Sequence, residues 1–135
     1  GIHSYEHKLF TKLNEDEILE QVSKTKNIIK DITGKSPNII RVPYGSMNKK
    51  IKNVLNSHSL TSVLWSVDSL DWKFKNTERT YNYVMKKFKG NDIILMHDSF
   101  DTSVEAAAKI VDTLQNRGYT FVTVSELIRI KKLAK

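Results

Sequence analysis

Strand-like and helix-like segments alternate along this chain at intervals of roughly 25 residues, and this alternation constrains its fold more than any other feature. Apolar runs rich in β-branched residues predict strands over residues 39–42, 61–67, 92–96 and 120–124. Apolar residues at helical spacing predict helices over 14–33, 51–58, 81–88 and 104–114, and a short last helix from Ser125 to Ile128. Strands that alternate with helices form parallel sheets with crossover helices, so the sequence predicts an α/β fold.

Local signals place several boundaries of these elements. Asn14 and Glu17 have the spacing of a helix N-cap and its reciprocal partner. Gly34, Gly90 and Gly118 are placed where helices commonly end. A chain of 135 residues, of which 39% are hydrophobic, is long enough for one domain or part of one, and too short for two ordinary domains.

The composition excludes several kinds of site. The 22 Lys and Arg residues outnumber the 15 Asp and Glu residues, giving a formal charge of +7, and the excess is spread over predicted helix faces as on a solvated surface. The sequence has no cysteine, so a bound metal would be held by histidine and carboxylate groups. It has no apolar run of membrane-spanning length and no signal-peptide pattern. We therefore expect neither a nucleic-acid partner nor a membrane segment in this chain.

Two histidines form a candidate metal site. His3 and His7 are four residues apart, so on a helical turn both imidazoles would project from one face and could share a metal ion. Metalloproteases with this spacing have Glu directly after the first histidine, whereas Ser4 stands there, which disfavours proteolysis. The alternative is a pair of surface histidines, because no third ligand is apparent.

A second group of candidates follows two predicted strands. His97 comes directly after the apolar run 93–96, so its imidazole is either a buried core group or a general acid or base. Asp71 offers a carboxylate that could orient this imidazole, although Asp68 and Asp71 could instead cap their own turn. Trp72 either packs in the core or presents an apolar surface to a sugar ring.

The segment Arg41-Val42-Pro43-Tyr44-Gly45 adds a third group. Arg41 could bind a carboxylate through two hydrogen bonds, and the rigid turn could direct a backbone N–H at a developing oxyanion. The alternative is a purely structural turn. Tyr44, Asp71 and His97 each follow the C-terminal end of a predicted strand, the edge where α/β proteins place their active sites, so we expect one shared pocket.

Taken together, these residues resemble the NodB-homology polysaccharide deacetylases, carbohydrate esterase family four, and most closely the peptidoglycan N-acetylglucosamine deacetylases of Gram-positive bacteria. The ordered motifs of that family correspond to His3–His7, Arg41–Gly45, Asp68–Trp72 and Leu95–His97, and residues 118–124 resemble its last strand. The resemblance covers almost the whole chain. It implies a distorted (β/α) barrel of the NodB-homology type, a zinc or similar divalent ion, and hydrolytic removal of N-acetyl groups from N-acetylglucosamine residues of peptidoglycan or a related polysaccharide.

The resemblance also implies a role for each candidate residue: metal ligands His3 and His7, catalytic residues His97, Asp71 and Arg41, and substrate-binding residues Tyr44, Trp72 and Leu95. On that basis His97 would protonate the departing amine, and Asp71 would tune His97. The Tyr44 backbone N–H would help to stabilise the oxyanion, and Arg41 would hold the carboxylate that acts as general base. Trp72 and Leu95 would line the acetyl and sugar pocket.

One family motif would lie upstream of residue 1. It is a Thr-Phe-Asp-Asp run that supplies the general base and the third metal ligand, and Ile2 also stands where the family more often has Asn. We therefore expect residues 1–135 to be the C-terminal two-thirds of a deacetylase domain, whose barrel is completed by the missing part or by another chain. Residues 1–135 alone are expected to be inactive and to hold zinc weakly.

Two other functions stay open. The chain could belong to a non-catalytic sugar-binding relic or an inactive fragment of the same fold. Alternatively, the metal site could be silent and the basic surface could bind an anionic polymer, which would make binding strongly dependent on salt. For the deacetylase, the resemblance implies an N-acetylated glycan as partner and an extracellular or cell-wall location in a Gram-positive bacterium.

Overall fold

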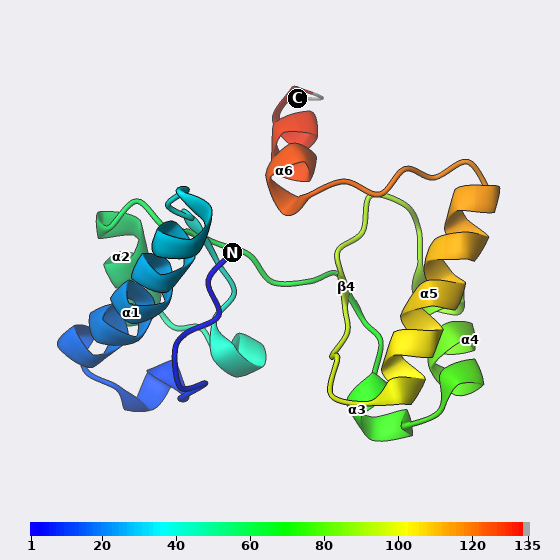
Figure 1. The fold of residues 1–135 in the computed structure, drawn as a ribbon, viewed down its shortest axis with the longest axis horizontal. Helices are drawn as coiled ribbons and strands as arrows, with labels where there is room; N and C mark the ends of the chain where they lie inside the picture. The colour runs from blue at the N-terminus through cyan, green and yellow to red at the C-terminus, as the bar shows by residue number, and fades with distance from the viewer. Residues whose placement is uncertain (134–135) are drawn as a thin grey trace. The chain divides into compact units, whose positions relative to one another are not determined.

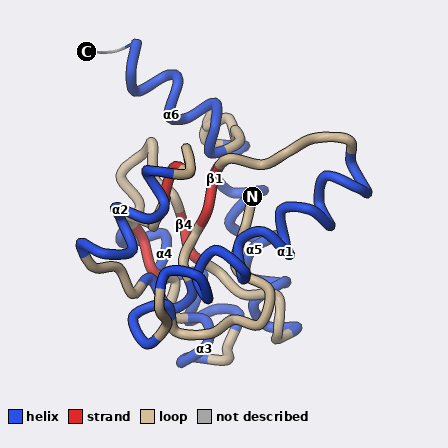
Figure 2. The backbone as a smooth tube through the Cα atoms, turned by 90° about the vertical axis from the view of Figure 1, so that its left-hand side faces the viewer, coloured by secondary structure: helices blue, strands red, loops and turns tan. Residues whose placement is uncertain are grey.

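The computed structural model describes residues 1–133, which divide into two compact units (Figure 1). The first unit comprises Gly1–Leu64, and the second begins at Trp65. Helices provide most of the regular structure, because each strand contains only two residues (Figure 2).

The first unit combines two helices with a short parallel sheet. Its elements are η1 (Phe10–Lys12), α1 (Glu15–Thr33), β1 (Ile39–Ile40), η2 (Pro43–Gly45), α2 (Lys49–Ser57) and β2 (Thr61–Ser62). Strand β1 pairs with β2 in parallel, and Ile2 forms an isolated parallel bridge with Ile40. Ile40 therefore has a parallel neighbour on either side, so the N-terminal segment runs beside β1.

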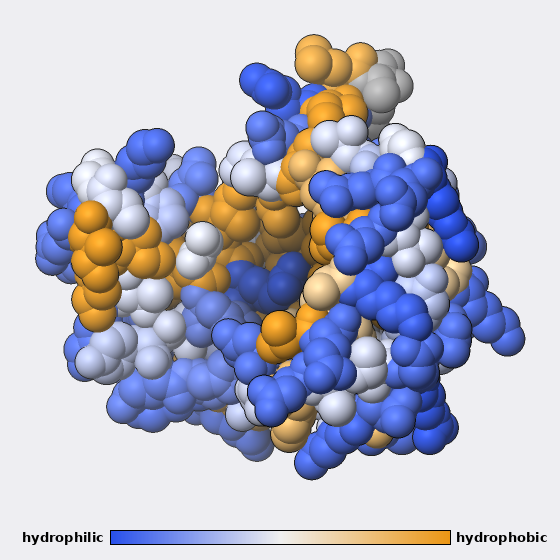
Figure 3. Space-filling view, turned by 45° about the vertical axis from the view of Figure 1, so that its right-hand side comes forward, coloured by the Kyte–Doolittle hydropathy of each residue, from blue (hydrophilic) through white to orange (hydrophobic). Residues whose placement is uncertain are grey.

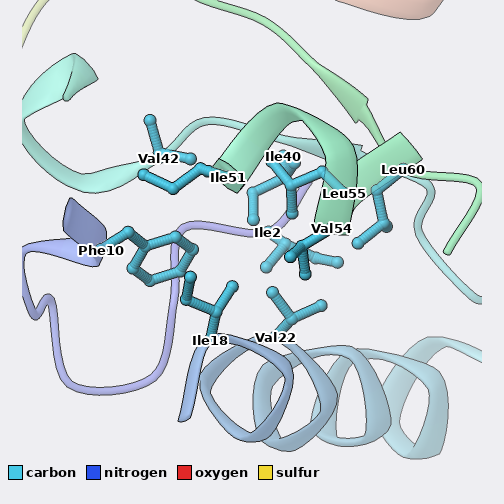
Figure 4. Close-up of a cluster of buried hydrophobic side chains, with 10 residues drawn as sticks. All are labelled: Ile2, Phe10, Ile18, Val22, Ile40, Val42, Ile51, Val54, Leu55 and Leu60. Atoms are coloured by element: carbon cyan, nitrogen blue, oxygen red, sulfur yellow. The ribbon is translucent and has the colours of Figure 1, made fainter. Parts of the chain in front are cut away.

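An apolar core holds these elements together (Figure 4). Helix α1 begins at the predicted capping box, in which the Asn14 side chain accepts a hydrogen bond from the Glu17 N–H at 2.9 Å and the Asn14 N–H donates to Glu17 at 2.7 Å. Helices α1 and α2, strand β1 and the N-terminal segment direct apolar side chains inward, among them Ile2, Phe10, Ile18, Ile40, Ile51 and Leu55. The predicted helices from residue 14 and over 51–58 are thus confirmed.

The second unit contains a parallel strand pair and a helix pair. Its elements are β3 (Val67–Asp68), α3 (Asp71–Phe74), α4 (Thr77–Lys87), β4 (Ile94–Leu95), α5 (Asp101–Asn116) and α6 (Val124–Leu133). Strands β3 and β4 are parallel, with Val67 opposite Ile94 and Asp68 opposite Leu95. Helices α4 and α5 lie side by side and bury Val84, Ile110 and Leu114 together with Val67 (Figure 1).

Two of the predicted strands are wrong in detail. Residues 61–67 do not form one strand, because the Val63 N–H donates to Ile40 whereas the Ser66 N–H donates to Ile93. Residues 120–123 form no strand in the described part of the chain, and Val124 already starts α6. Thr123 and Glu126 bond reciprocally, a capping box that begins a helix at this point instead of prolonging a strand.

The buried face of α5 also differs from the expected one. The helix buries Ser103, Ala106, Ile110 and Leu114, whereas Val104, the apolar residue that begins the predicted helix over 104–114, is 54% exposed. The buried residues are three or four positions apart and form one narrow stripe along the helix. Val104 lies outside that stripe.

Hydrophilic residues predominate on the face shown in Figure 3, with apolar residues in separate patches. Among residues 1–133 no helix combines the length and apolarity needed to cross a membrane. The predicted α/β class with parallel strands and intervening helices is confirmed in both units.

Candidate active site

The first group of candidate residues lies beside β1. The Ile2 N–H donates to Ile39 at 2.8 Å and the Arg41 N–H donates to Ile2 at 3.0 Å, which places His3 beside the end of β1. The ring nitrogen Nδ1 of His3 lies 2.7 Å from the Arg41 carbonyl oxygen. Because a carbonyl oxygen only accepts, Nδ1 carries the proton and Nε2 is the ring's electron-pair donor. A metal ligand is commonly oriented by such a bond on its second nitrogen.

The two histidines are adjacent, but not on a helical turn. Ser4 and His7 adopt positive φ angles of 63° and 56°, so residues 3–7 form a tight loop, and the expected helical placement is wrong. The Ser4 hydroxyl accepts a hydrogen bond from the His7 N–H at 2.9 Å, which closes this loop. The centroids of the His3 and His7 rings are 4.9 Å apart at an interplanar angle of 69°. The loop thus achieves the juxtaposition that the four-residue spacing suggested.

These two imidazoles fit part of a metal site. Neutral imidazole is a favoured ligand of zinc, and a catalytic zinc usually has three protein ligands. Within residues 1–133 there is no group of three or more His, Cys, Asp or Glu side chains placed to hold a metal. The described residues therefore offer two neighbouring donors, and a complete site requires at least one more.

Tyr44 lies next to the histidine pair. The η2 turn begins at the buried Pro43, and Tyr44 adopts a left-handed conformation with φ 60° and ψ 6°. Its ring is 67% exposed and contacts the His7 ring edge-on, with centroids 4.7 Å apart. The turn thus presents an aromatic side chain to solvent beside His7, and the predicted role of its backbone N–H stays a prediction.

Arg41 directly follows β1 and is held by bonds from both its backbone N–H and its side chain. Its Nη2 donates to the Leu64 carbonyl oxygen at 3.4 Å. Burial lowers the pKa of Arg41 from its ordinary value, although a guanidinium stays charged at any pH at which proteins are folded. Its predicted carboxylate partner is not tested by the structure.

The second unit brings Asp71 and His97 together. Both residues follow the C-terminal ends of the parallel strands β3 and β4. The Asp71 oxygen Oδ2 accepts a hydrogen bond from the His97 backbone N–H at 2.7 Å, and Oδ1 lies 2.8 Å from the ring nitrogen Nδ1. Because a carboxylate accepts, Nδ1 carries the proton and the Nε2 nitrogen of His97 is the atom that can exchange a proton with a bound molecule. The predicted contact is present.

Asp71 is a buried anion. Its side chain is 1% exposed, whereas that of His97 is 41% exposed. Burial raises the pKa of Asp71, but hydrogen bonds from the His97 ring and backbone N–H and the influence of Ser103 and Trp72 outweigh it, so the pKa lies below its ordinary value. The Ser103 hydroxyl is buried close to this carboxylate, but within residues 1–133 it makes no hydrogen bond of normal geometry. Asp71 is therefore ionised at neutral pH and holds the imidazole in one orientation.

Trp72 directly follows Asp71 in the sequence, and Leu95 precedes His97 by two residues. The Trp72 N–H donates to Asp71 Oδ1 at 2.8 Å, while its side chain is 50% exposed. Leu95 is half-buried in β4. Asp68 has a local role, because its carboxylate accepts from the Leu70 N–H at 2.9 Å, where Leu70 has a positive φ of 54°. Asp68 thus caps its own turn, as the alternative interpretation proposed, whereas Asp71 binds the backbone and the ring of His97.

Comparison with known proteins decides the family. A sequence model of the polysaccharide deacetylases matches residues 1–63. The peptidoglycan-N-acetylmuramic acid deacetylase PdaC of Bacillus subtilis is 38% identical over 98% of this chain and 28% of its own length. The solved structure of PdaC superposes with a TM-score of 0.92 and 37% identity, over 99% of this chain and 65% of that chain. The chain belongs to the polysaccharide deacetylase family.

Other polysaccharide deacetylases show how far this similarity extends. The peptidoglycan-N-acetylglucosamine deacetylase PgdA of Listeria monocytogenes is 35% identical over 94% of this chain and 27% of its own length. The structure of BA3943 from Bacillus anthracis, a CE4 family pseudoenzyme, has a TM-score of 0.85 and 29% identity over 94% of this chain and 45% of that chain. The fold of this chain is that of part of the family's barrel, and the chain spans less than a third of the length of PdaC and PgdA.

Sequence reasoning missed residues that support the candidate site. Gln21 and Ser103 are buried polar residues on the inner faces of α1 and α5, and Ser4 closes the histidine loop. The available signal was a polar residue at a position where helical spacing predicts an apolar one, as for Gln21 beside Ile18 and Val22. His58 is the C-cap residue of α2, and its ring nitrogen Nδ1 bonds to the Val54 carbonyl oxygen at 2.9 Å.

Proposed function

We propose that the protein carrying this chain is a metal-dependent hydrolase that removes N-acetyl groups from N-acetylglucosamine residues of peptidoglycan. The observation that carries the proposal is the buried Asp71 carboxylate bound to the imidazole of His97, in a chain of the polysaccharide deacetylase family. The similarity to peptidoglycan deacetylases supports the substrate class. A peptidoglycan substrate would place the protein outside the cell membrane, at the cell wall.

In this proposal His97 supplies the proton for the leaving group. The amide nitrogen of the acetylated sugar leaves poorly as an anion, so its protonation must accompany cleavage of the C–N bond. His97 Nε2 would give that proton, while Asp71 keeps Nδ1 protonated and the ring oriented. The exposed Trp72 and the half-buried Leu95 would contact the sugar and its acetyl group.

The histidine pair would hold the divalent ion, for which zinc is the proposed identity. His3 and His7 suit this role because their rings are adjacent and His3 is oriented through its second nitrogen. When bound, a zinc ion supplies Lewis-acid polarisation of the acetamide carbonyl and of a water molecule. Arg41 would position a general-base carboxylate from outside residues 1–135, and the Tyr44 N–H would donate to the oxyanion.

The test is acetate release by the intact protein. With peptidoglycan fragments as substrate, His97→Ala is expected to lower kcat by about 10²- to 10⁴-fold, because general acid catalysis contributes on that order. His58→Ala is the matched control, since His58 caps α2 and is expected to leave kcat unchanged. Mass spectrometry of the products locates the lost acetyl group. Loss from N-acetylmuramic acid alone, or an undiminished His97→Ala enzyme, would contradict the proposal.

A non-catalytic sugar-binding protein is the second candidate. The similarity to the pseudoenzyme BA3943 supports it, because that structure shares the fold with 29% identity. An intact protein of this kind would bind N-acetylglucosamine oligomers and release no acetate, with or without added zinc. Measurable acetate release that depends on His97 rejects this candidate.

A further inference from the structure

Gln21 is a buried polar residue in the middle of α1 whose side-chain amide bonds only to the histidine loop among the described residues. The side chain lies on the core face of the helix beside Ile18 and Val22, and the residue is 3% exposed. Its Oε1 accepts hydrogen bonds from the Glu6 N–H at 2.8 Å and the Tyr5 N–H at 3.2 Å. Its Nε2 donates to Glu6 Oε2 at 2.5 Å.

The bonded loop segment lies between the two histidines. Tyr5 and Glu6 are the central residues of the turn from His3 to His7, so Gln21 fixes the backbone that joins the imidazoles. This backbone is strained, because Ser4 and His7 hold positive φ angles that residues with a Cβ rarely adopt. Strained turns persist where surrounding contacts specify them, and the contacts here come from the Ser4 hydroxyl and the Gln21 amide.

The position of Gln21 in the core makes a purely packing role a poor explanation. An amide removed from water is destabilising unless its donors and acceptor are bonded, and an apolar residue would pack beside Ile18 and Val22 without that requirement. Here the amide reaches out of the helix to three polar atoms of a single loop. The hydrogen-bonding capacity of Gln21 is thus directed at the loop that carries His3 and His7.

We propose that Gln21 is a positioning residue that fixes the Tyr5–Glu6 backbone and thereby sets the separation of His3 and His7 for one shared divalent cation. This inference rests on the proposed function, because that function gives the histidine pair its metal. Gln21 itself touches neither the ion nor the substrate. Residues that orient metal ligands in this way weaken metal binding by about 10- to 100-fold when they are replaced.

The test compares zinc affinity in variants of the intact protein. Gln21→Leu removes all the amide bonds and is expected to weaken zinc binding by about 10- to 100-fold. In Gln21→Glu a carboxylate oxygen replaces the amide nitrogen that donates to Glu6. The two carboxylates repel each other, so this variant is also expected to bind zinc more weakly than the wild type. Adding Glu6→Gln restores a donor opposite that oxygen, and this double variant is expected to recover most of the affinity of the wild type.

Two controls separate positioning from stability. Val22→Ala opens a cavity beside Gln21 in the same core and is expected to lower the unfolding midpoint without changing zinc affinity. Gln115→Leu makes the same chemical change at an exposed position of α5 and is expected to change neither. The imidazole resonances of His3 and His7 in the metal-free protein should shift in Gln21→Leu and remain in place in both controls.

The possible results distinguish the positioning role of Gln21 from the proposed deacetylase function. Unchanged zinc affinity in Gln21→Leu, or a failure of the double variant to recover affinity, would overturn the positioning role. A wild type that releases no acetate, but loses zinc affinity when Gln21 is replaced, would contradict the deacetylase and leave the positioning role standing. A wild type that does not bind zinc would overturn both.

Discussion

Replacing Asp71 with asparagine is expected to destabilise the protein by about 2–4 kcal/mol at neutral pH. The Asp71 carboxylate accepts from the His97 backbone N–H, the His97 ring and the Trp72 N–H, all within 2.8 Å. Asparagine has a single acceptor oxygen. If that oxygen takes the place of Oδ1, its amide nitrogen faces the His97 N–H, and two donors are left opposed in a site that is 1% exposed.

The magnitude follows from these contacts. Losing one bond to a charged acceptor in a buried site costs about 1.5–3 kcal/mol, and the remaining bonds become neutral and weaken by roughly half. The bond to the imidazole contributes less than a buried one, because the His97 side chain is 41% exposed to solvent screening. Part of this loss is offset, because burying the neutral asparagine amide costs less free energy than burying the aspartate anion.

The pH dependence provides the sharpest check. The pKa of Asp71 is lower in the folded than in the unfolded protein, so its stabilisation is fully present above about pH 4–5 and is lost as the pH falls through the folded-state value. Urea unfolding of wild type and Asp71→Asn from about pH 7 to about pH 2 should therefore give a free-energy difference that shrinks towards low pH. A difference that is constant over this range, or below about 0.5 kcal/mol throughout, would refute the reasoning.

Other regions give simpler expectations. Phe10→Ala should cost about 3–5 kcal/mol in urea unfolding, because Phe10 is fully buried, and a loss below about 1 kcal/mol would contradict its place in the core. Asn14→Ala should cost about 1 kcal/mol by breaking the α1 capping box, whereas an unchanged midpoint would show that the cap contributes nothing. Residues 72–91 hold six Lys or Arg and one Glu, a net charge of +5. If this segment binds anionic polymer, replacing Lys86 and Lys87 with Glu should weaken binding at low salt only; equal weakening at high salt would exclude an electrostatic role.

The helices were largely readable from the sequence because their signals are local. The reciprocal pair Asn14 and Glu17 marks the start of α1, and Gly34 at φ 70° ends it. The apolar spacing of Ile51, Val54 and Leu55 similarly identified the buried face of α2. Such features depend on residues within one or two turns of each other, so they are nearly independent of the rest of the chain.

The strands were less predictable, since a strand exists only when a partner pairs with it. The run 61–67 has uniform β-branched character, but its two ends bond to different partners, Ile40 and Ile93. Residues 120–123 have similar character and form no ladder within residues 1–133. Predicting strands from runs of apolar and β-branched residues therefore gave strands longer than those in the structure.

The sequence by itself determined which chemical groups are available: paired histidines, a carboxylate and an imidazole after successive strands, and the family motifs that contain them. Only the tertiary structure decided how these groups are held. It showed that a strained loop, fixed by Ser4 and the buried Gln21, brings His3 and His7 together in place of a helical turn. It also showed that Asp71 binds His97 through both backbone and ring. The bonds from Gln21 to the loop and from Asp71 to His97 join residues 15 to 26 positions apart, and no local pattern specifies such a contact before the chain has folded.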